Sequence, residues 1–191
     1  MLRACIFAAL LTLVCSANIR AAYTRTGDWS ASVNGLRGRL SVSEDKPFNG
    51  TKMLAVYLEL QNVSDVGNPI ELYFDPIRTV VSRVIDDAGK DLAQPPNAAS
   101  ITSPPPFWLS IPWDGSLRFH ASVYGYGVYK DSGTQVSMAN GSWLIKPGDK
   151  SKYFLQASLI SKPTAGDKRR AWTGELMLPK VEVSQLPKDR F

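Results

Sequence analysis

Short runs of alternating apolar and polar residues constrain the fold of this chain more than any other feature. Such runs occur at 36–42, 54–61, 117–122, 153–159 and 172–178. Successive side chains of a β-strand point to opposite faces, so strict alternation is typical of a strand with one buried face. The chain therefore reads as a series of half-buried strands.

The run at 54–61 fixes a register that can be tested. Leu58 and Leu60 alternate with Glu59 and Gln61. We expect the two leucines to be core residues, and we expect their truncation to alanine to be severe. A register shifted by one residue would bury Tyr57 instead.

Glycine and proline divide the remaining chain into short segments. The 14 glycines and 13 prolines are spread through it and do not gather in one linker. Further strand candidates lie at 70–74, 143–145 and 181–183, separated by turn residues. Seven to nine short strands of this kind predict an all-β fold, an antiparallel β-sandwich of immunoglobulin-like type.

Two segments are harder to interpret. The apolar residues of 77–85 fit a helical stripe, but they are mostly β-branched, so we expect a strand and keep a short helix as the alternative. The segment 94–112 holds five prolines before its last residue, in 95–96 and 104–106. Because proline cannot donate to a ladder, we expect a long loop there.

The N-terminus reads as a secretory signal peptide. A basic residue, Arg3, precedes a short apolar run, and Cys15-Ser16-Ala17 offers small residues for cleavage. We expect a signal peptide at 1–17, with cleavage as late as 22, a lead-in at 18–35, one sandwich domain at 36–185 and a tail at 186–191. The mature chain is then secreted or periplasmic, without a transmembrane segment.

Cysteine and histidine usage excludes several kinds of chemistry. Both cysteines, Cys5 and Cys15, fall inside the predicted signal, and His120 is the single histidine. A mature chain without cysteine has no disulfide and no thiolate site, and zinc or copper needs more ligands than one imidazole. We therefore predict no metal, no cofactor, no Ser-His-Asp site and a monomeric chain.

Carboxylates leave one enzymatic alternative open. Asp86, Asp87 and Asp91 cluster near one turn, and Glu44-Asp45 near another. Two facing carboxylates could hydrolyse a glycan. Acidic residues at turns more often serve turn chemistry and solubility, so we predict that the protein is not an enzyme.

Positive charge gathers in the C-terminal quarter. The whole chain carries 22 basic and 17 acidic residues, a net charge of +5, and 146–191 holds 10 of the basic and 5 of the acidic ones. Lys168, Arg169 and Arg170 form its densest cluster, a candidate contact for polyanions. An exported chain makes nucleic acid an unsuitable partner, so none is predicted.

Four strand phrases carry a resemblance to a known group. They are NGLRGRL at 34–40, LELQNVS at 58–64, DAGK at 87–90 and WTGEL at 172–176. The chain resembles uncharacterised exported bacterial proteins, and immunoglobulin-like modules attached to antirepressor-type zinc metallopeptidases. The resemblance implies an immunoglobulin-like fold outside the cytoplasm and supplies no catalytic residues.

Aromatic residues give the best candidate binding surface. Trp108 and Trp113 lie within or beside the proline-rich segment, and Tyr124 and Tyr126 flank a glycine-rich turn. Flat aromatic faces at loop tips can stack on sugar rings or anchor a protein. Alternatively, the two tryptophans fold back as buried caps, and this capping role is the one we expect.

These observations lead to three hypotheses about function. The first is an exported, non-catalytic β-sandwich module that binds a protein or an envelope glycan. The second is a carboxylate-based glycan hydrolase, and the third is a structural or inhibitory module of the envelope. Three sequons, at Asn49, Asn62 and Asn140, fall where turns are expected.

Overall fold

The computed structural model describes residues 24–44, 52–94, 105–121, 133–162 and 171–184, and these residues form strands joined by turns and no helix. The strands are β1 (Thr24–Thr26), β2 (Leu36–Glu44), β3 (Lys52–Asn62), β4 (Ile70–Phe74), β5 (Val80–Asp86), β6 (Phe107–Ile111), β7 (Ser116–His120), β8 (Thr134–Met138), β9 (Gly141–Ile145), β10 (Tyr153–Ser161) and β11 (Gly174–Glu182). The predicted all-β class is confirmed.

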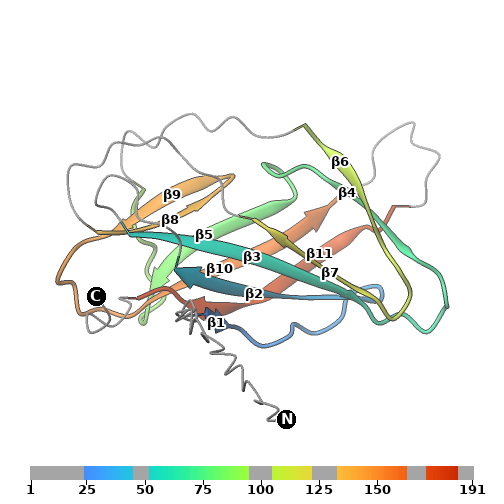
Figure 1. Ribbon diagram of the computed structural model, residues 1–191, viewed down its shortest axis with the longest axis horizontal. Helices are drawn as coiled ribbons and strands as arrows, with labels where there is room; N and C mark the ends of the chain where they lie inside the picture. The colour runs from blue at the N-terminus through green and yellow to red at the C-terminus, as the bar shows by residue number, and fades with distance from the viewer. Residues whose placement is uncertain (1–23, 45–51, 95–104, 122–132, 163–170, 185–191) are drawn as a thin grey trace, which may run out of the picture.

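The strands form three sheets (Figure 1). The largest has the order β1-β2-β3-β8-β9, and β7 also pairs with β3. This is possible because β3 is 11 residues long. Its first residues pair in parallel with β8, and its second half pairs antiparallel with β7. A second sheet has the order β11-β10-β5, and a third joins β4 to β6; both are antiparallel.

The first two sheets share one apolar core. Leu58 and Leu60 of β3 and Leu178 of β11 are fully buried in the same cluster, as the alternation predicts. The two sheets are in close contact at Gly38 of β2, where a Cβ atom would lie 2.8 Å from Leu178 Cδ2 and 3.0 Å from Leu60 Cδ2. Only glycine fits there without displacing a core leucine.

The ambiguous segment 77–85 is a turn followed by a strand. The Asp75 carboxylate accepts the backbone N–H of Ile77 at 3.0 Å, and the Thr79 N–H donates to the Asp75 carbonyl at 2.7 Å. The β-branched residues then extend as β5 from Val80 onward. The strand prediction is therefore correct for all but the first three residues, and the alternative of a short helix is wrong.

Three strands depart from the expectations. β1 lies inside the predicted lead-in at 18–35 and pairs with β2. The loop predicted at 94–112 contains β6, which fits between the prolines of 104–106 and Pro112 and so keeps its own N–H groups. β8 was not predicted, because all five of its residues are buried and no alternation marks it. Its polar side chains are satisfied internally: Gln135 Nε2 donates to the hydroxyls of Ser137 and Ser142 at 2.9 and 3.0 Å.

Most of the run at 172–178, from Gly174 onward, continues through Pro179 into one strand, β11, which ends at Glu182. Leu178 pairs with Ala157 and Val181 with Leu155, so two residues of β11 oppose Gln156 alone. Pro179 lies in this bulge, which is where a sheet tolerates proline.

Several predictions fall on residues that the structure does not describe. These include the signal peptide with both cysteines, and Asn49. Within the described residues, no helix is long and apolar enough to cross a membrane. Asn62 is described, and it is fully buried.

Candidate functional site

A groove of about 420 Å³ opens beside the start of β4. Its lining comes from three connections that are far apart in the sequence and from the first two residues of β4. The lining includes Asn34, Ser64, Asn68, Glu71 and Trp172, and we call this pocket the Glu71 groove. Glu71 is the one carboxylate among the described residues that line it, and none of them is basic.

One wall of the Glu71 groove is a tight turn that requires glycine. Asn34 and Gly35 have positive φ angles of 49° and 78° and reverse the chain into β2. A Cβ atom on Gly35 would lie 2.6 Å from Ser64 Cβ. The Asn34 amide donates to the Thr173 carbonyl at 2.8 Å, which ties this wall to the segment before β11.

Trp172 holds that segment in place. The ring is only 6% exposed, and its Nε1 donates to the Val33 carbonyl at 3.0 Å. Its backbone N–H donates to the Glu71 carbonyl at 2.6 Å. The groove therefore has a fixed shape before anything binds.

Asn62 organises the adjoining wall, which the connection from β3 to β4 forms. Its Oδ1 accepts from the Ser64 backbone N–H and hydroxyl at 3.1 and 2.7 Å. Its Nδ2 donates to the carbonyls of Asn68 and Ile111 at 2.9 and 3.2 Å. In the sequence Asn62 stands out only as a sequon, whereas in the structure it is buried and positions the backbone around it.

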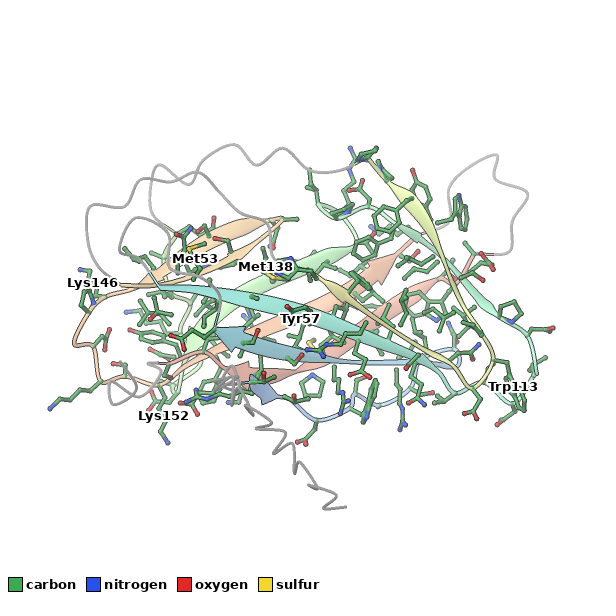
Figure 2. All side chains as sticks on the ribbon, viewed as in Figure 1. Met53, Tyr57, Trp113, Met138, Lys146 and Lys152 are labelled. Atoms are coloured by element: carbon green, nitrogen blue, oxygen red, sulfur yellow. The ribbon has the colours of Figure 1, made fainter. Side chains whose placement is uncertain are left out.

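Trp113 stands beside this wall, exposed over 56% of its surface. It lies in the turn from β6 to β7, at the opposite end of the molecule from Lys146 (Figure 2). Its indole Nε1 donates to the carbonyl of Ser64 at 3.0 Å, and Ser64 lines the Glu71 groove. Trp113 is therefore not a buried cap: its N–H is anchored while much of the ring faces solvent.

Trp108 lies on strand β6 and not in a loop. It is half-buried, and its ring centroid is 5.4 Å from that of Tyr73 on β4. The neighbouring pair along the same strands is Glu71 and Ser110, whose hydroxyl donates to Glu71 Oε1 at 2.5 Å. Alternate residues of a strand share a face about 6.8 Å apart, so the Tyr73–Trp108 pair continues the surface from Glu71.

The other residues singled out from the sequence lie away from the Glu71 groove or outside the described residues. Tyr124, Tyr126, Lys168, Arg169 and Arg170 lie outside the described residues. His120 is exposed on β7, with its ring centroid 5.2 Å from that of Tyr57 in an edge-to-face contact. No three His, Cys, Asp or Glu side chains gather as a metal site in the part of the chain that the structure describes.

The side chain of Asn140, in the third sequon, also forms hydrogen bonds within the fold. Its Nδ2 donates to the Ser82 carbonyl at 2.8 Å, and its Oδ1 accepts from the Ser82 hydroxyl. Asn140 thereby ties the turn between β8 and β9 to β5.

Comparisons of the chain with protein-family models, with curated proteins and with solved structures found no match. The structure itself supports an all-β chain with several mostly antiparallel sheets.

Proposed function

We propose that this chain is an exported, non-catalytic module with an immunoglobulin-like β-sandwich fold, which binds a glycan or a protein of the cell envelope. Two sheets that share one core are consistent with the sandwich. The signal-like N-terminus supports a secreted or periplasmic location. The observation that carries the binding role is the exposed, anchored Trp113 beside the Glu71 groove.

The composition of this groove favours a neutral glycan over a protein. Sugar rings present apolar faces that stack on aromatic side chains, and hydroxyls that pair with amides and carboxylates. Trp113, Asn34, Asn68 and Glu71 are residues of these kinds. Preformed geometry lowers the entropy lost on binding.

The same lining argues against the glycan hydrolase. Both retaining and inverting glycosidases use a pair of carboxyl groups that flank the scissile bond. Among the described lining residues, Glu71 has no acidic companion, and its Oε1 accepts a hydrogen bond from Ser110. A binding role needs no second carboxylate.

Titration of the purified protein with neutral oligosaccharides, such as chito- and cello-oligosaccharides, tests this proposal by calorimetry. We expect Trp113→Ala to weaken binding about tenfold, since an aromatic contact contributes about 1.5 kcal/mol. The matched control is Met177→Ala, because Met177 on β11 is also 56% exposed. Binding that tolerates Trp113→Ala, or no binding of any neutral oligosaccharide, would contradict the glycan assignment.

A further inference from the structure

The outward face of the largest sheet carries a regular array of charged and aromatic side chains. The register of β2, β3 and β7 sets three rows of opposed residues. The rows are Arg37–Gln61–Ser116, Arg39–Glu59–Arg118 and Ser41–Tyr57–His120. We call this surface, together with Trp29, the arginine face; Figure 2 shows Tyr57 near the middle of the molecule, away from Trp113.

Trp29 supports two of the arginines. Its segment runs along β2, where the Ser30 N–H donates to the Gly38 carbonyl at 2.9 Å and the Gly27 N–H to the Leu40 carbonyl at 2.8 Å. The guanidinium carbons of Arg37 and Arg39 then lie 4.8 and 4.4 Å from the Trp29 ring centroid. These are cation–π distances.

Hydrogen bonds fix the same guanidinium groups laterally. Arg37 Nε and Nη2 donate to Gln61 Oε1 at 2.9 and 2.7 Å, and Arg39 Nε donates to Glu59 Oε2 at 2.8 Å. Arg118 lies 4.4 Å from the Tyr57 ring centroid, and its Nη2 donates to the Ser41 hydroxyl at 3.4 Å. The three groups are therefore held in place before any ligand arrives.

The charge of the array is unbalanced. Three arginines share one glutamate, Glu59, which leaves a net charge of +2 on the three rows without counting His120. A guanidinium has five N–H donors, and the bonds to Gln61 occupy only two of those of Arg37. Fixed arginines with donors to spare match carboxylate and other oxyanion groups.

We propose that the arginine face binds an acidic polysaccharide. Single-stranded nucleic acid binds by stacking bases on open aromatic rings, but guanidinium groups already cover Trp29 and Tyr57. A chain of carboxylated sugars needs only charge and hydrogen bonds from a flat surface. This site is independent of the Glu71 groove, which has no basic lining residue among those described.

The opposite sheet offers a matched control. Arg83 of β5 donates from Nε and Nη2 to Gln156 Oε1 at 3.1 and 2.9 Å, the same arrangement as Arg37 with Gln61. Arg83 Nη1 also lies 3.6 Å from Asp91 Oδ1, which neutralises it. An equal substitution at Arg83 removes the same side chain from a surface without the charged array.

The experiment measures binding of the purified protein to immobilised polygalacturonate as a function of salt. We expect Arg37→Gln/Arg118→Gln to weaken binding about tenfold or more at low salt, and to reduce the salt dependence by roughly one ion per arginine removed. Arg83→Gln should bind like the parent protein. Glu59→Gln, which raises the net charge of the rows to +3, should bind more tightly and guards against a folding artefact.

Four results would overturn the proposal. The first is that Arg83→Gln weakens binding to polygalacturonate as much as Arg37→Gln/Arg118→Gln does. The second is that Arg37→Gln/Arg118→Gln binds as tightly as the parent protein. The third is that only Lys168→Gln/Arg169→Gln/Arg170→Gln weakens binding to polygalacturonate, which would assign the polyanion to the C-terminal cluster. The fourth is tighter binding of single-stranded DNA than of polygalacturonate through the same arginines. Dextran sulfate, a second probe that carries sulfate groups but no carboxylates, separates sulfate from carboxylate recognition, and uncharged dextran should not bind this face.

Discussion

Two outward sheet faces of this molecule carry the same arginine–glutamine pair in different surroundings. On the arginine face, Arg37 and Gln61 have a second arginine and the Trp29 ring beside them. On the face of β5, β10 and β11, Arg83 and Gln156 border a shallow hollow of about 180 Å³ with Val81 and Met177.

The difference lies in the neighbours and not in the pair itself. Val81 and Met177 are 47% and 56% exposed, and Met177 Sδ accepts from the Ser158 hydroxyl at 3.5 Å. Asp91 neutralises Arg83, whereas Arg37 has no carboxylate partner among the described residues. We therefore expect a strand arginine to contribute to anion binding where register places other arginines beside it and they outnumber the carboxylates, as on the arginine face.

The largest expected effect tests which face of β3 points outward. Leu58→Ala should lower the free energy of unfolding by about 2–5 kcal/mol, because Leu58 is fully buried in the shared core. Tyr57→Ala, one residue away on the arginine face, should cost much less. Urea denaturation compares them, and a reversed order would show that the outward face has been assigned to the wrong residues.

A smaller effect on stability is expected when the ion pairs of the two faces are broken in turn. The Arg39–Glu59 pair has an N–O distance of 2.8 Å, with side chains 30% and 21% exposed. The Arg83–Asp91 pair is longer, at 3.6 Å, and its side chains are 55% and 64% exposed. Glu59→Gln should cost about 0.2–1 kcal/mol of stability and Asp91→Asn almost nothing. Equal costs, from the same denaturation experiment, would remove this distinction between the faces.

The smallest effect lies at the start of β10, at the edge of the second face. The Ser151 backbone N–H and the Tyr153 hydroxyl donate to the Asp149 carboxylate at 2.9 and 2.8 Å, lowering the pKa of Asp149 below its ordinary 3.8. The hydrogen bond to Asp149, together with burial, raises the pKa of Tyr153 above 10.0.

The two pKa shifts limit the stabilisation that the Asp149–Tyr153 hydrogen bond provides to a window of pH. The Asp149 contribution is present above its unfolded pKa and is lost as pH falls through the folded value. The Tyr153 contribution is present below its unfolded pKa and is lost as pH rises through the folded value. Asp149→Asn should move the Tyr153 titration down toward 10.0, as measured by ultraviolet absorbance of the phenolate with Tyr153→Phe as the blank. An unchanged midpoint would contradict the hydrogen bond.

Alternation in the sequence was enough to predict strands with one buried face. β4 follows it along its whole length, and β2 and β3 follow it over 36–40 and 56–61, where buried apolar residues alternate with partly exposed ones. It could not reveal β8, whose buried polar residues bond to one another. It also missed β6, because proline marked the whole segment as a loop.

The candidate sites were less accessible to sequence reasoning. Trp113 was a candidate from its position beside a proline-rich segment, but the buried cap expected for it is wrong, since it is exposed. The role of Asn62 depends on contacts with the β3–β4 connection and β6. The arginine face depends on the register of β7 against β3, which joins Arg118 to Glu59 across about 60 residues. Local patterns in one sequence do not contain that register.

The central claim is that a neutral glycan and a polyanion bind at separate places. Nitrogen-15 NMR of the indole and guanidinium Nε–H groups tests it in one titration series. We predict that a neutral oligosaccharide shifts the Trp113 resonance and that oligogalacturonate shifts those of Arg37 and Arg39, while Arg83 is unaffected by either. Shifts at Arg83 equal to those at Arg37, or no response of Trp113 to any neutral oligosaccharide, would contradict the account.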